Sequence, residues 1–334
     1  MSIADHTFRL RRVLCCCATF ALAGVLAAPA RGQTVNAESS SDQVLSSGSI
    51  ISISTTGTAP VFKVVVSNSP CPAWYTDLYV LVEYFAPNGH TTYWQDDSGY
   101  IYGDGSFQYQ AAQEGGPVTV TYVIYDGLGA EVTEGTRTFT ILGQQPSTAS
   151  IDGQIASNPW FFSSMIYQES TYQQYNLTTH DVNNASVGYP KYSYDGYGTG
   201  LTQIDPRKNT IVDADFWSWS QNITDGRTIL NGYALSTSTT FWNSQVSQMN
   251  SQNPGTYPAP TNFPYCRFAY PQGGSHLYRD ADWINAYNGT GGNGIYPPGY
   301  FIYWVQKVGT KPGYWVVKNN VRTYVSDVCN TAPR

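Results

Sequence analysis

The sequence Val118-Thr-Val-Thr-Tyr-Val-Ile-Tyr125 decides the fold class of the first half of the chain. It is a run of β-branched and aromatic residues between the turn signals Glu114-Gly-Gly-Pro117 and Asp126-Gly127. Runs of this composition and length, bounded in this way, are typical of β-strands. The segment therefore predicts a strand with a tight turn at each end.

Similar runs on both sides extend this all-β pattern from residue 48 to residue 142. The strand candidates cover residues 50–53, 61–66, 78–84, 91–94, 106–109, 118–125 and 136–141. About seven short strands in roughly a hundred residues are typical of an immunoglobulin-like sandwich. We therefore expect this sandwich over 48–142, after a flexible Ser- and Gln-rich lead over 33–47 and before a linker over 143–150. The segment shows no pattern that would carry chemistry, so we interpret it as a spacer or assembly domain, or as a module that binds the cell wall or a protein partner.

The first 32 residues have the pattern of a secretory signal peptide. Arg9, Arg11 and Arg12 precede an apolar run over 13–28, and Ala28-Pro29-Ala30 matches a small-x-small cleavage site. The apolar run is too short for a membrane span. We therefore expect a secreted or periplasmic protein, with no membrane span in the mature chain.

Three of the six cysteines lie inside the predicted signal peptide. The mature chain keeps Cys71, Cys266 and Cys329. In an oxidising compartment two of these can pair, and a bridge between Cys266 and Cys329 within one domain would leave Cys71 unpaired. The sequence alone does not fix this pairing.

The charge balance of the mature chain bears on its partners. Removing residues 1–32 takes away four Arg and one Asp, which leaves 13 basic and 22 acidic residues and a formal net charge of −9. Binding to nucleic acid needs clustered Lys and Arg, so this balance excludes it as an expected function.

Glu169 stands at the end of a predicted helix in a segment with few charges. Asn158 is a candidate N-cap, and Pro159 suits the first helical position. Apolar residues share one helix face with the glutamate, at spacings of three and four: Phe162, Met165 and Ile166. Apolar surroundings disfavour a carboxylate and raise its pKa toward neutrality. Glu169 is therefore a candidate general acid.

Further motifs follow in a fixed order after Glu169-Ser170. They are Gly200-Leu-Thr-Gln-Ile204, Asn222-Ile223, Ala286-Tyr-Asn-Gly289 and Val321-Arg-Thr-Tyr-Val325. Together they resemble the lytic transglycosylases of the lysozyme-like superfamily, whose catalytic domain is related to goose-type lysozyme and which cleave peptidoglycan. The resemblance covers about residues 155–330. Thr202 departs from the usual Met of the second motif, and residues 173–197 are an insertion that we expect to form a loop beside the cleft.

The resemblance implies a mainly α lysozyme-like domain over 151–334, and hence a multidomain chain with an all-β sandwich first. It implies cleavage of peptidoglycan glycan strands between MurNAc and GlcNAc, with Glu169 acting first as acid and then as base to form a 1,6-anhydroMurNAc end. It also implies substrate-binding or cleft-lining roles for a further set of residues: Ser170, Gly200, Gln203, Tyr287, Asn288 and Tyr324.

Two other functions stay open at this point. A hydrolytic glycosidase would need a second carboxylate, and Asp181, Asp195 and Asp205 are candidates without motif support. A secreted glycan-binding or structural protein would need no catalysis at all. His180 and His276 have no partner at metal-ligand spacing and no phosphate-binding loop is visible, so we expect no cofactor.

Overall fold

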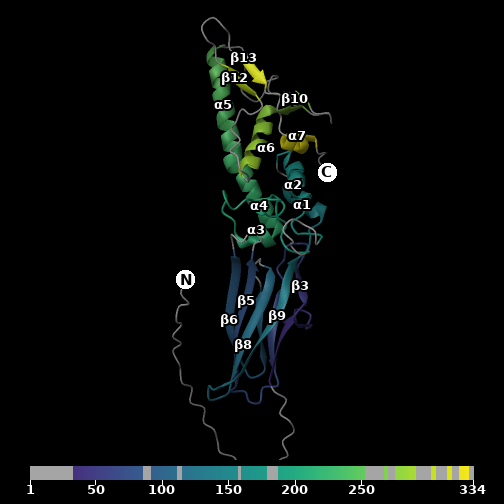
Figure 1. Cartoon of the computed structure of the whole chain (residues 1–334), viewed down its shortest axis with the longest axis vertical. Helices are drawn as coiled ribbons and strands as arrows, with labels where there is room; N and C mark the ends of the chain where they lie inside the picture. The colour runs from purple at the N-terminus through teal and green to yellow at the C-terminus, as the bar shows by residue number, and fades with distance from the viewer. Residues whose placement is uncertain are drawn as a thin grey trace, which may run out of the picture.

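The computed structural model describes residues 33–85, 92–110, 115–156, 159–178, 187–252, 267–269, 275–290, 302–305, 314–317 and 323–330. The predicted signal peptide lies outside these ranges. The molecule is elongated, with the large sheets at one end and the helices at the other (Figure 1).

Two mainly antiparallel sheets form the first half of the described chain. The smaller sheet has the order β2-β1-β4-β7 and consists of β1 (Thr34–Ser39), β2 (Val44–Leu45), β4 (Val61–Ser67) and β7 (Gly105–Gln110). The larger sheet has the order β3-β9-β8-β5-β6 and consists of β3 (Ile50–Ile53), β5 (Tyr75–Phe85), β6 (Thr92–Tyr102), β8 (Gly116–Tyr125) and β9 (Glu131–Gly143). Within it, β3 runs parallel to β9. Each of the seven strand candidates overlaps an observed strand.

The two sheets enclose one apolar core. Alternate residues of β8 point into it, so that Val118, Val120 and Ile124 are buried. From the smaller sheet, Phe62 and Val64 fill the same core. This alternation of buried and outward residues is what a strand with one packed face requires.

The expected flexible lead over 33–47 is wrong. Thr34–Ser39 forms β1, which pairs along its whole length with β4, and Val44–Leu45 forms β2. Val35 and Ala37 are buried between the sheets. The segment is ordered because its alternate apolar residues complete the core, although its Ser- and Gln-rich composition resembles that of a linker.

Helices dominate after residue 147. They are α1 (Thr148–Ile155), α2 (Phe162–Ser170), α3 (Asp213–Trp217), α4 (Trp219–Ile229), the π-helical turn η1 (Leu230–Ala234), α5 (Leu235–Gln252), α6 (Tyr278–Thr290) and α7 (Thr323–Asn330). Two small hairpins accompany them: β10 (Arg267–Ala269) with β11 (Ser275–Leu277), and β12 (Ile302–Val305) with β13 (Tyr314–Val317). Of the described helices, none is both long and apolar enough to cross a membrane.

The expected fold class, an all-β immunoglobulin-like sandwich followed by a mainly α lysozyme-like domain, is wrong. Strand residues outnumber helical residues in the described ranges, and the two large sheets dominate the fold. Only α5 is a long helix, and the other helices are interrupted by loops and hairpins. No clear helical lysozyme-like domain follows the sheets in the part of the chain that the structure describes. Gly-, Asn- and Tyr-rich stretches, such as 187–212, explain the difference because they favour turns over helix.

The helical part also shares a core with the sheets. Tyr175, Tyr192, Phe216 and Trp217 belong to the same buried cluster as the sheet residues. The hydroxyls of Tyr84 on β5 and Tyr192 lie 2.6 Å apart in a buried hydrogen bond. The sheets and the helices are therefore joined by packed side chains as well as by the chain connection near residue 145.

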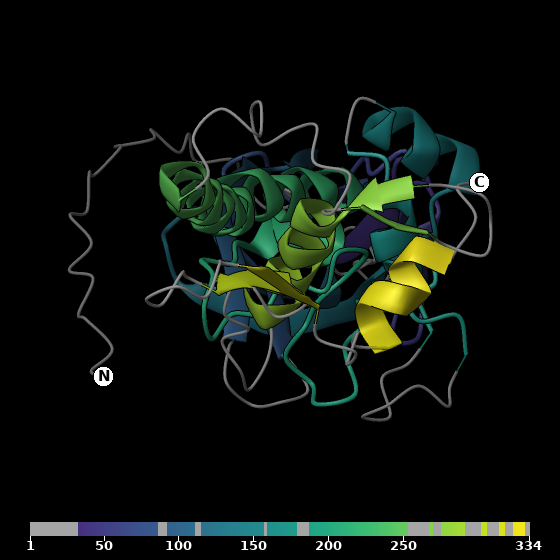
Figure 2. The ribbon, with the colours of Figure 1, turned by 90° about the horizontal axis from the view of Figure 1, so that it is seen from above.

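A second apolar cluster lies among the helices and carries the candidate site. It contains Phe162, Met165 and Ile166 of α2, Ile284 and Tyr287 of α6, and Val325 and Val328 of α7. In the view from above, α5, α6 and α7 spread across this end of the molecule (Figure 2). The α7 helix packs against both α2 and α6, so residues far apart in sequence meet there.

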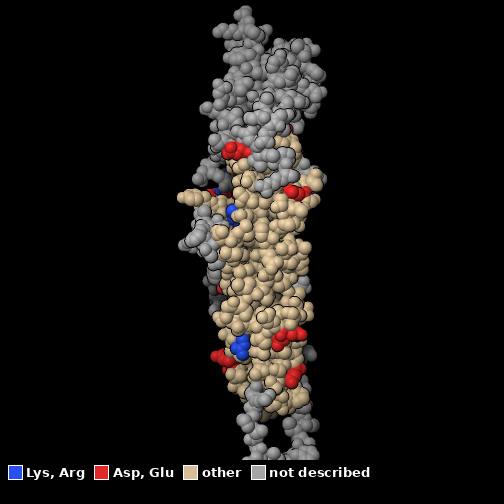
Figure 3. Space-filling view, turned by 90° about the vertical axis from the view of Figure 1, so that its right-hand side faces the viewer, with Lys and Arg blue, Asp and Glu red and all other residues tan. Residues whose placement is uncertain are grey.

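The described surface carries few charges. On the face in Figure 3, the Lys, Arg, Asp and Glu side chains are few, and uncharged residues cover most of the described area. This surface favours contacts through hydroxyl, amide and aromatic groups rather than through long-range electrostatic attraction.

Candidate functional site

The glutamate of the site is held by a short helix. Phe162, Met165 and Ile166 of α2 are each about 1% exposed and anchor one face of the helix in the second core. The helix starts at Phe162, with Phe161 in the cap position, rather than next to Asn158, which lies outside the described residues. It ends at Thr171, which adopts the left-handed conformation with φ +55°. Glu169 is therefore in the last turn, and its side chain projects from the edge of the packed face.

The pKa of Glu169 is raised to about 7 by its surroundings. Burial against apolar neighbours is the main cause, and a hydrogen bond from the Tyr324 hydroxyl to Oε1 opposes it. Its place at the carboxyl end of a helix also disfavours negative charge. Because Tyr324 binds Oε1, Oε2 is the oxygen that can carry the proton. Glu169 can therefore hold a proton near neutral pH.

Tyr287, which is buried, and Tyr324, which is partly buried, stand beside this carboxyl group. Burial is the main reason why the pKa values of Tyr287 and Tyr324 lie far above the usual tyrosine range, and the nearby charge of Glu169 adds to the effect. Both therefore remain neutral hydrogen-bond donors. Tyr287 donates to the carbonyl oxygen of Thr202 at 2.8 Å, which ties α6 to the loop opposite Glu169.

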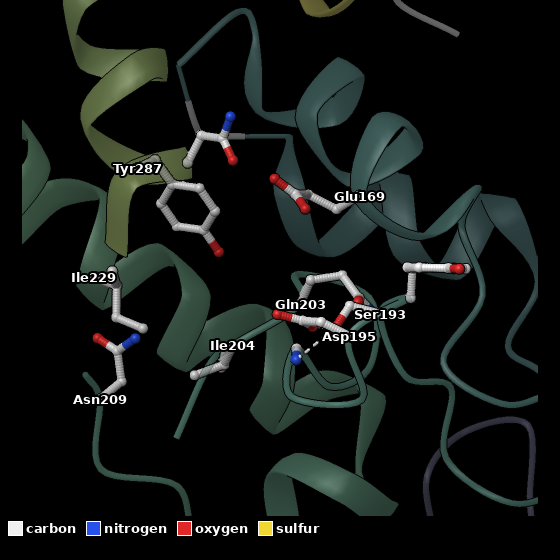
Figure 4. Close-up of a pocket in the computed structure, with 11 residues that line it drawn as sticks. Glu169, Ser193, Asp195, Gln203, Ile204, Asn209, Ile229 and Tyr287 are labelled. Carbon is white, nitrogen blue, oxygen red and sulfur yellow. Dashed lines mark hydrogen bonds between the residues drawn. The ribbon is translucent and has the colours of Figure 1, made fainter. Parts of the chain in front are cut away.

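Glu169 lines a pocket with a volume of about 280 Å³. The lining includes Glu169, Tyr194, Asp195, Gln203, Tyr287 and Asn288. Figure 4 shows Glu169 and Tyr287 facing each other from α2 and α6, with Gln203 and Asp195 on the side between them. The volume is close to the lower end of the range of about 300–1,000 Å³ for ligand pockets.

The loop 199–204 forms the floor of the site, and Asn222 of α4 holds it. Asn222 Oδ1 accepts hydrogen bonds from the backbone N–H and the hydroxyl of Thr202, both at 2.9 Å. Its Nδ2 donates to the carbonyl oxygens of Thr199 at 2.9 Å and of Asp215 at 3.1 Å. Asn222 is fully buried, so these bonds replace those that water would make. Thr202 thus serves as a polar anchor of this loop.

Gln174 supports the same loop from the other side. Its Oε1 accepts from the Leu201 N–H at 3.1 Å, and its Nε2 donates to the carbonyl oxygens of Asp215 and Phe216 at 3.1 and 2.9 Å. Gln174 is also fully buried. Together with Asn222, it fixes the loop to the start of α4.

Gly200 does not line the pocket, contrary to the substrate-binding role that the resemblance implies for it. It has φ +71°, and a Cβ atom there would lie 2.6 Å from both Asn222 Nδ2 and Gln174 Oε1. The position needs glycine because the backbone passes closely between these two side chains. Its contribution to the site is to let the loop pack.

Gln203 lies in the wall of the pocket. It has φ +52°, lines the pocket, and donates from Nε2 to the Gly200 carbonyl oxygen at 2.7 Å. Its Oε1 is buried without a hydrogen-bond partner in the described residues. An unpaired buried acceptor at a pocket wall is suited to a hydroxyl or amide N–H of a ligand.

Ser170 also does not line the pocket, contrary to the substrate-binding role that the resemblance implies for it. Its hydroxyl donates to the Ile166 carbonyl oxygen at 3.0 Å, and the residue is buried outside the pocket lining. It therefore bonds to the backbone of α2, one helical turn earlier. Asn288, in contrast, lines the pocket, and its substrate-binding role stays a prediction.

The three candidates for a second carboxylate differ in their position relative to the pocket. Asp195 lines the pocket with Glu169. Burial acts to raise the pKa of Asp195, but hydrogen bonds from Ser193, the Tyr197 N–H and Arg207, with the charge of Arg207, outweigh it and hold this pKa below the usual range. Asp205 is buried outside the lining, where it pairs with Arg207 and accepts from the Arg207 N–H at 2.8 Å. Asp181 lies outside the described residues.

Sequence reasoning missed the pocket residue Tyr194 and the loop anchors Asn222 and Gln174. The dipeptide Asp195-Gly196 is a turn signal that would have marked the rim of the pocket. Asn222 belonged to one of the motifs, but no role was assigned to it. No feature of the sequence around Gln174 distinguishes it from the other polar residues of its segment.

The remaining predictions concern cysteines and histidines. Cys71 is exposed with a free thiol. Cys266 and His180 lie outside the described residues, as do the side chains of Cys329 and His276. In the described part of the chain, no group of three His, Cys, Asp or Glu residues is arranged to hold a metal ion. The disulfide stays a prediction, as does the absence of a cofactor.

Comparison with known proteins gives no family. No protein-family model matches the chain, and no curated protein matches it. Among solved structures, the N-terminal domain of PorA is similar over 32% of this chain and 97% of its own length, with 15% sequence identity and a TM-score of 0.17. Such a low TM-score carries no argument about fold or function.

Proposed function

We propose that the chain is a secreted or periplasmic enzyme that cleaves peptidoglycan glycan strands as a lytic transglycosylase. The observation that carries the proposal is Glu169, a carboxyl group with a pKa of about 7 at the wall of a pocket. The choice of peptidoglycan comes from the order of sequence motifs, in which Glu169, Gln203, Tyr287, Asn288 and Tyr324 occur. All five are found at or next to the same pocket.

The first step needs a proton on the glycosidic oxygen between MurNAc and GlcNAc. Protonated Glu169 donates it as the bond from C1 to that oxygen breaks. Tyr324 keeps its hydrogen bond to Oε1 and stabilises the carboxylate that results. The departing sugar leaves with a hydroxyl group.

In the second step the same carboxylate acts as a base. It takes the proton of the C6 hydroxyl of MurNAc, and O6 forms a bond to C1. The product is a 1,6-anhydroMurNAc end, Glu169 is protonated again, and no water is consumed. A pKa near 7 suits a group that must both give and take a proton.

Binding roles follow from the unpaired groups of the pocket. Gln203 Oε1 accepts from a sugar hydroxyl or N-acetyl N–H, and Asn288 supplies an amide at the same wall. Tyr287 positions the loop that carries Gln203 through its bond to Thr202.

Hydrolysis is the second candidate, and Asp195 favours it. Its low pKa makes Asp195 a carboxylate at the pH at which Glu169 is still protonated. An acid and a carboxylate with separated pKa values are what a two-carboxylate glycosidase uses. Asp195 would then activate a water or stabilise the positive charge at C1.

Product analysis separates these functions. Peptidoglycan is digested with the wild type, Glu169→Gln and Asp195→Asn, and the muropeptides are read by mass spectrometry. Transglycosylation predicts products one water lighter than hydrolytic ones, absent with Glu169→Gln and still formed by Asp195→Asn. Reducing ends that require both carboxylates would show a hydrolase. Absence of products with the wild type, on several wall types, would contradict both and favour a binding or structural protein.

A further inference from the structure

Tyr194 is an aromatic residue that the fold leaves in solvent at the pocket. It is 88% exposed, although it belongs to the lining. A tyrosine ring that is exposed to this extent gains little free energy from burial in the folded state. Its exposed position at the pocket leaves the ring available for contact with a bound ligand.

The turn that carries Tyr194 is firmly closed. The Gly196 N–H donates to the Ser193 carbonyl oxygen at 2.9 Å, which makes Tyr194 the second residue of a β-turn. Ser193 also bonds twice to Gly198, from its own N–H at 2.8 Å and through its hydroxyl, which accepts from the Gly198 N–H at 2.8 Å. The backbone under the ring is therefore fixed before any ligand binds.

An ion pair holds the turn to the neighbouring loop. Asp195 Oδ2 lies 2.9 Å from Arg207 Nη2, and Arg207 also pairs with the buried Asp205. The guanidinium of Arg207 lies over the ring of Tyr197, 3.8 Å from its centroid. These contacts join Asp195 and Tyr197, which follow Tyr194 in sequence, to the neighbouring loop, so the exposed ring is presented from an anchored turn.

We propose that Tyr194 is the residue that stacks on a sugar ring of the bound glycan at the open side of the pocket; this inference rests on the proposed function. A pyranose ring has an apolar face of C–H groups, and its hydroxyls lie around the edge. A flat aromatic side chain covers that face, and the hydroxyls remain in water. Because the turn is rigid, little conformational freedom is lost on binding.

The stacking residue determines which substrates bind well. The pocket of about 280 Å³ holds the sugar at Glu169, and Tyr194 adds contact area for the next ring of the strand. Glycan strands should therefore bind better than a single disaccharide, and this difference should depend on the aromatic ring of Tyr194.

The test measures binding without turnover. Glu169→Gln is combined with Tyr194→Ala, with Tyr194→Phe or with Tyr102→Ala, and calorimetry measures the affinity for glycan strands freed of their peptide stems. Tyr102 is 69% exposed on β6 of the sheets and serves as a matched exposed tyrosine. Aromatic contacts of this kind contribute about three- to tenfold in affinity. We expect Tyr194→Ala to weaken binding by about that factor, Tyr194→Phe to restore it to within about twofold, and Tyr102→Ala to leave it unchanged.

The other outcomes overturn the inference in distinguishable ways. Equal affinity of the Tyr194→Ala protein and its parent would reject Tyr194 and leave the proposed function intact. An equal loss with Tyr194→Phe would show that the ring face is not what binds. If the Glu169→Gln protein binds no glycan strand although it is folded, the proposed function and this inference fail together.

Discussion

The hydroxyl of Tyr324 donates a hydrogen bond to Oε1 of Glu169, across 155 residues of sequence. Tyr324 lies at the start of α7 and Glu169 in the last turn of α2, so the contact depends on the packing of these two helices. The bond opposes the rise in pKa that burial causes, and it selects which carboxyl oxygen carries the proton.

Removing that hydroxyl should shift the pH dependence of the reaction. In Tyr324→Phe the carboxylate loses a donor, so the pKa of Glu169 should rise above its value of about 7. The proton donor then persists to higher pH, and the alkaline fall of kcat/KM should move upward by about one pH unit. Tyr233→Phe, which changes an exposed tyrosine, is the control. A pH profile that is the same in Tyr324→Phe and the wild type would contradict the role of the bond.

Asp215 should make the stability of the protein depend on pH. Burial and, to a smaller extent, the neighbouring Asp225 raise its pKa to about 7, while the Val212 N–H opposes the shift. A folded-state pKa above the unfolded value means that the stabilisation is complete below about pH 4 and is lost as pH rises through 7. The free energy of unfolding should therefore fall between pH 5 and pH 8, and Asp215→Asn should remove about 2–3 kcal/mol of this fall.

Urea unfolding at several pH values checks this expectation. Asp213→Asn, two residues away and partly exposed, serves as the matched control and should keep the wild-type pH dependence. The same slope in Asp215→Asn and the wild type would show that Asp215 does not cause it.

Asn222→Ala should destabilise the fold and reduce activity. The change leaves the Thr202 N–H and two carbonyl oxygens without their buried partner, which should cost about 2–4 kcal/mol of unfolding free energy. The loop with Gln203 loses its anchor, so kcat/KM should fall even where the protein is fully folded. Thr228→Ala on the exposed side of α4 should change the free energy by less than about 0.5 kcal/mol. Full activity of folded Asn222→Ala would contradict the anchoring role.

The sheets and helices should unfold together. Trp217 is fully buried in the core shared by both parts, and Gly115 lies so close to its ring that a Cβ there would be 2.5 Å away. Trp217→Ala should lower the unfolding free energy by about 3–5 kcal/mol. Calorimetry of the wild type should show one transition, and Trp217→Ala should shift it as a whole. Two separate transitions, of which the substitution shifts one, would show that the halves are independent.

The sequence predicted those parts of the fold that depend on local pattern. The run of β-branched and aromatic residues over 118–125, bounded by turn signals, predicted β8. Residues 34–39 have no such local mark, and their strand forms through pairing with β4 far along the chain. The lysozyme-like helical domain was inferred from motifs, and motifs fix a few positions without fixing the helices between them.

The site, like the fold, was predicted from the sequence only in part. Glu169, Gln203, Tyr287 and Asn288 were predicted, and all four line one pocket. Gly200 and Ser170 were expected to bind substrate, but Gly200 lets the loop pack and Ser170 bonds to the backbone of α2. A motif does not distinguish a residue that touches a ligand from one that holds the backbone in place. Tyr194 is found only from its exposure in the folded chain.

The central claim is that Glu169 cleaves the glycan without water entering the product. The most direct measurement is digestion of purified peptidoglycan in water enriched in the heavy oxygen isotope, with the wild type, Glu169→Gln and, as a control carboxylate on an exposed strand, Glu131→Gln. We expect new 1,6-anhydro ends without heavy oxygen from the wild type and Glu131→Gln, and no new ends from folded Glu169→Gln. New ends that carry heavy oxygen, or undiminished cleavage by Glu169→Gln, would contradict it.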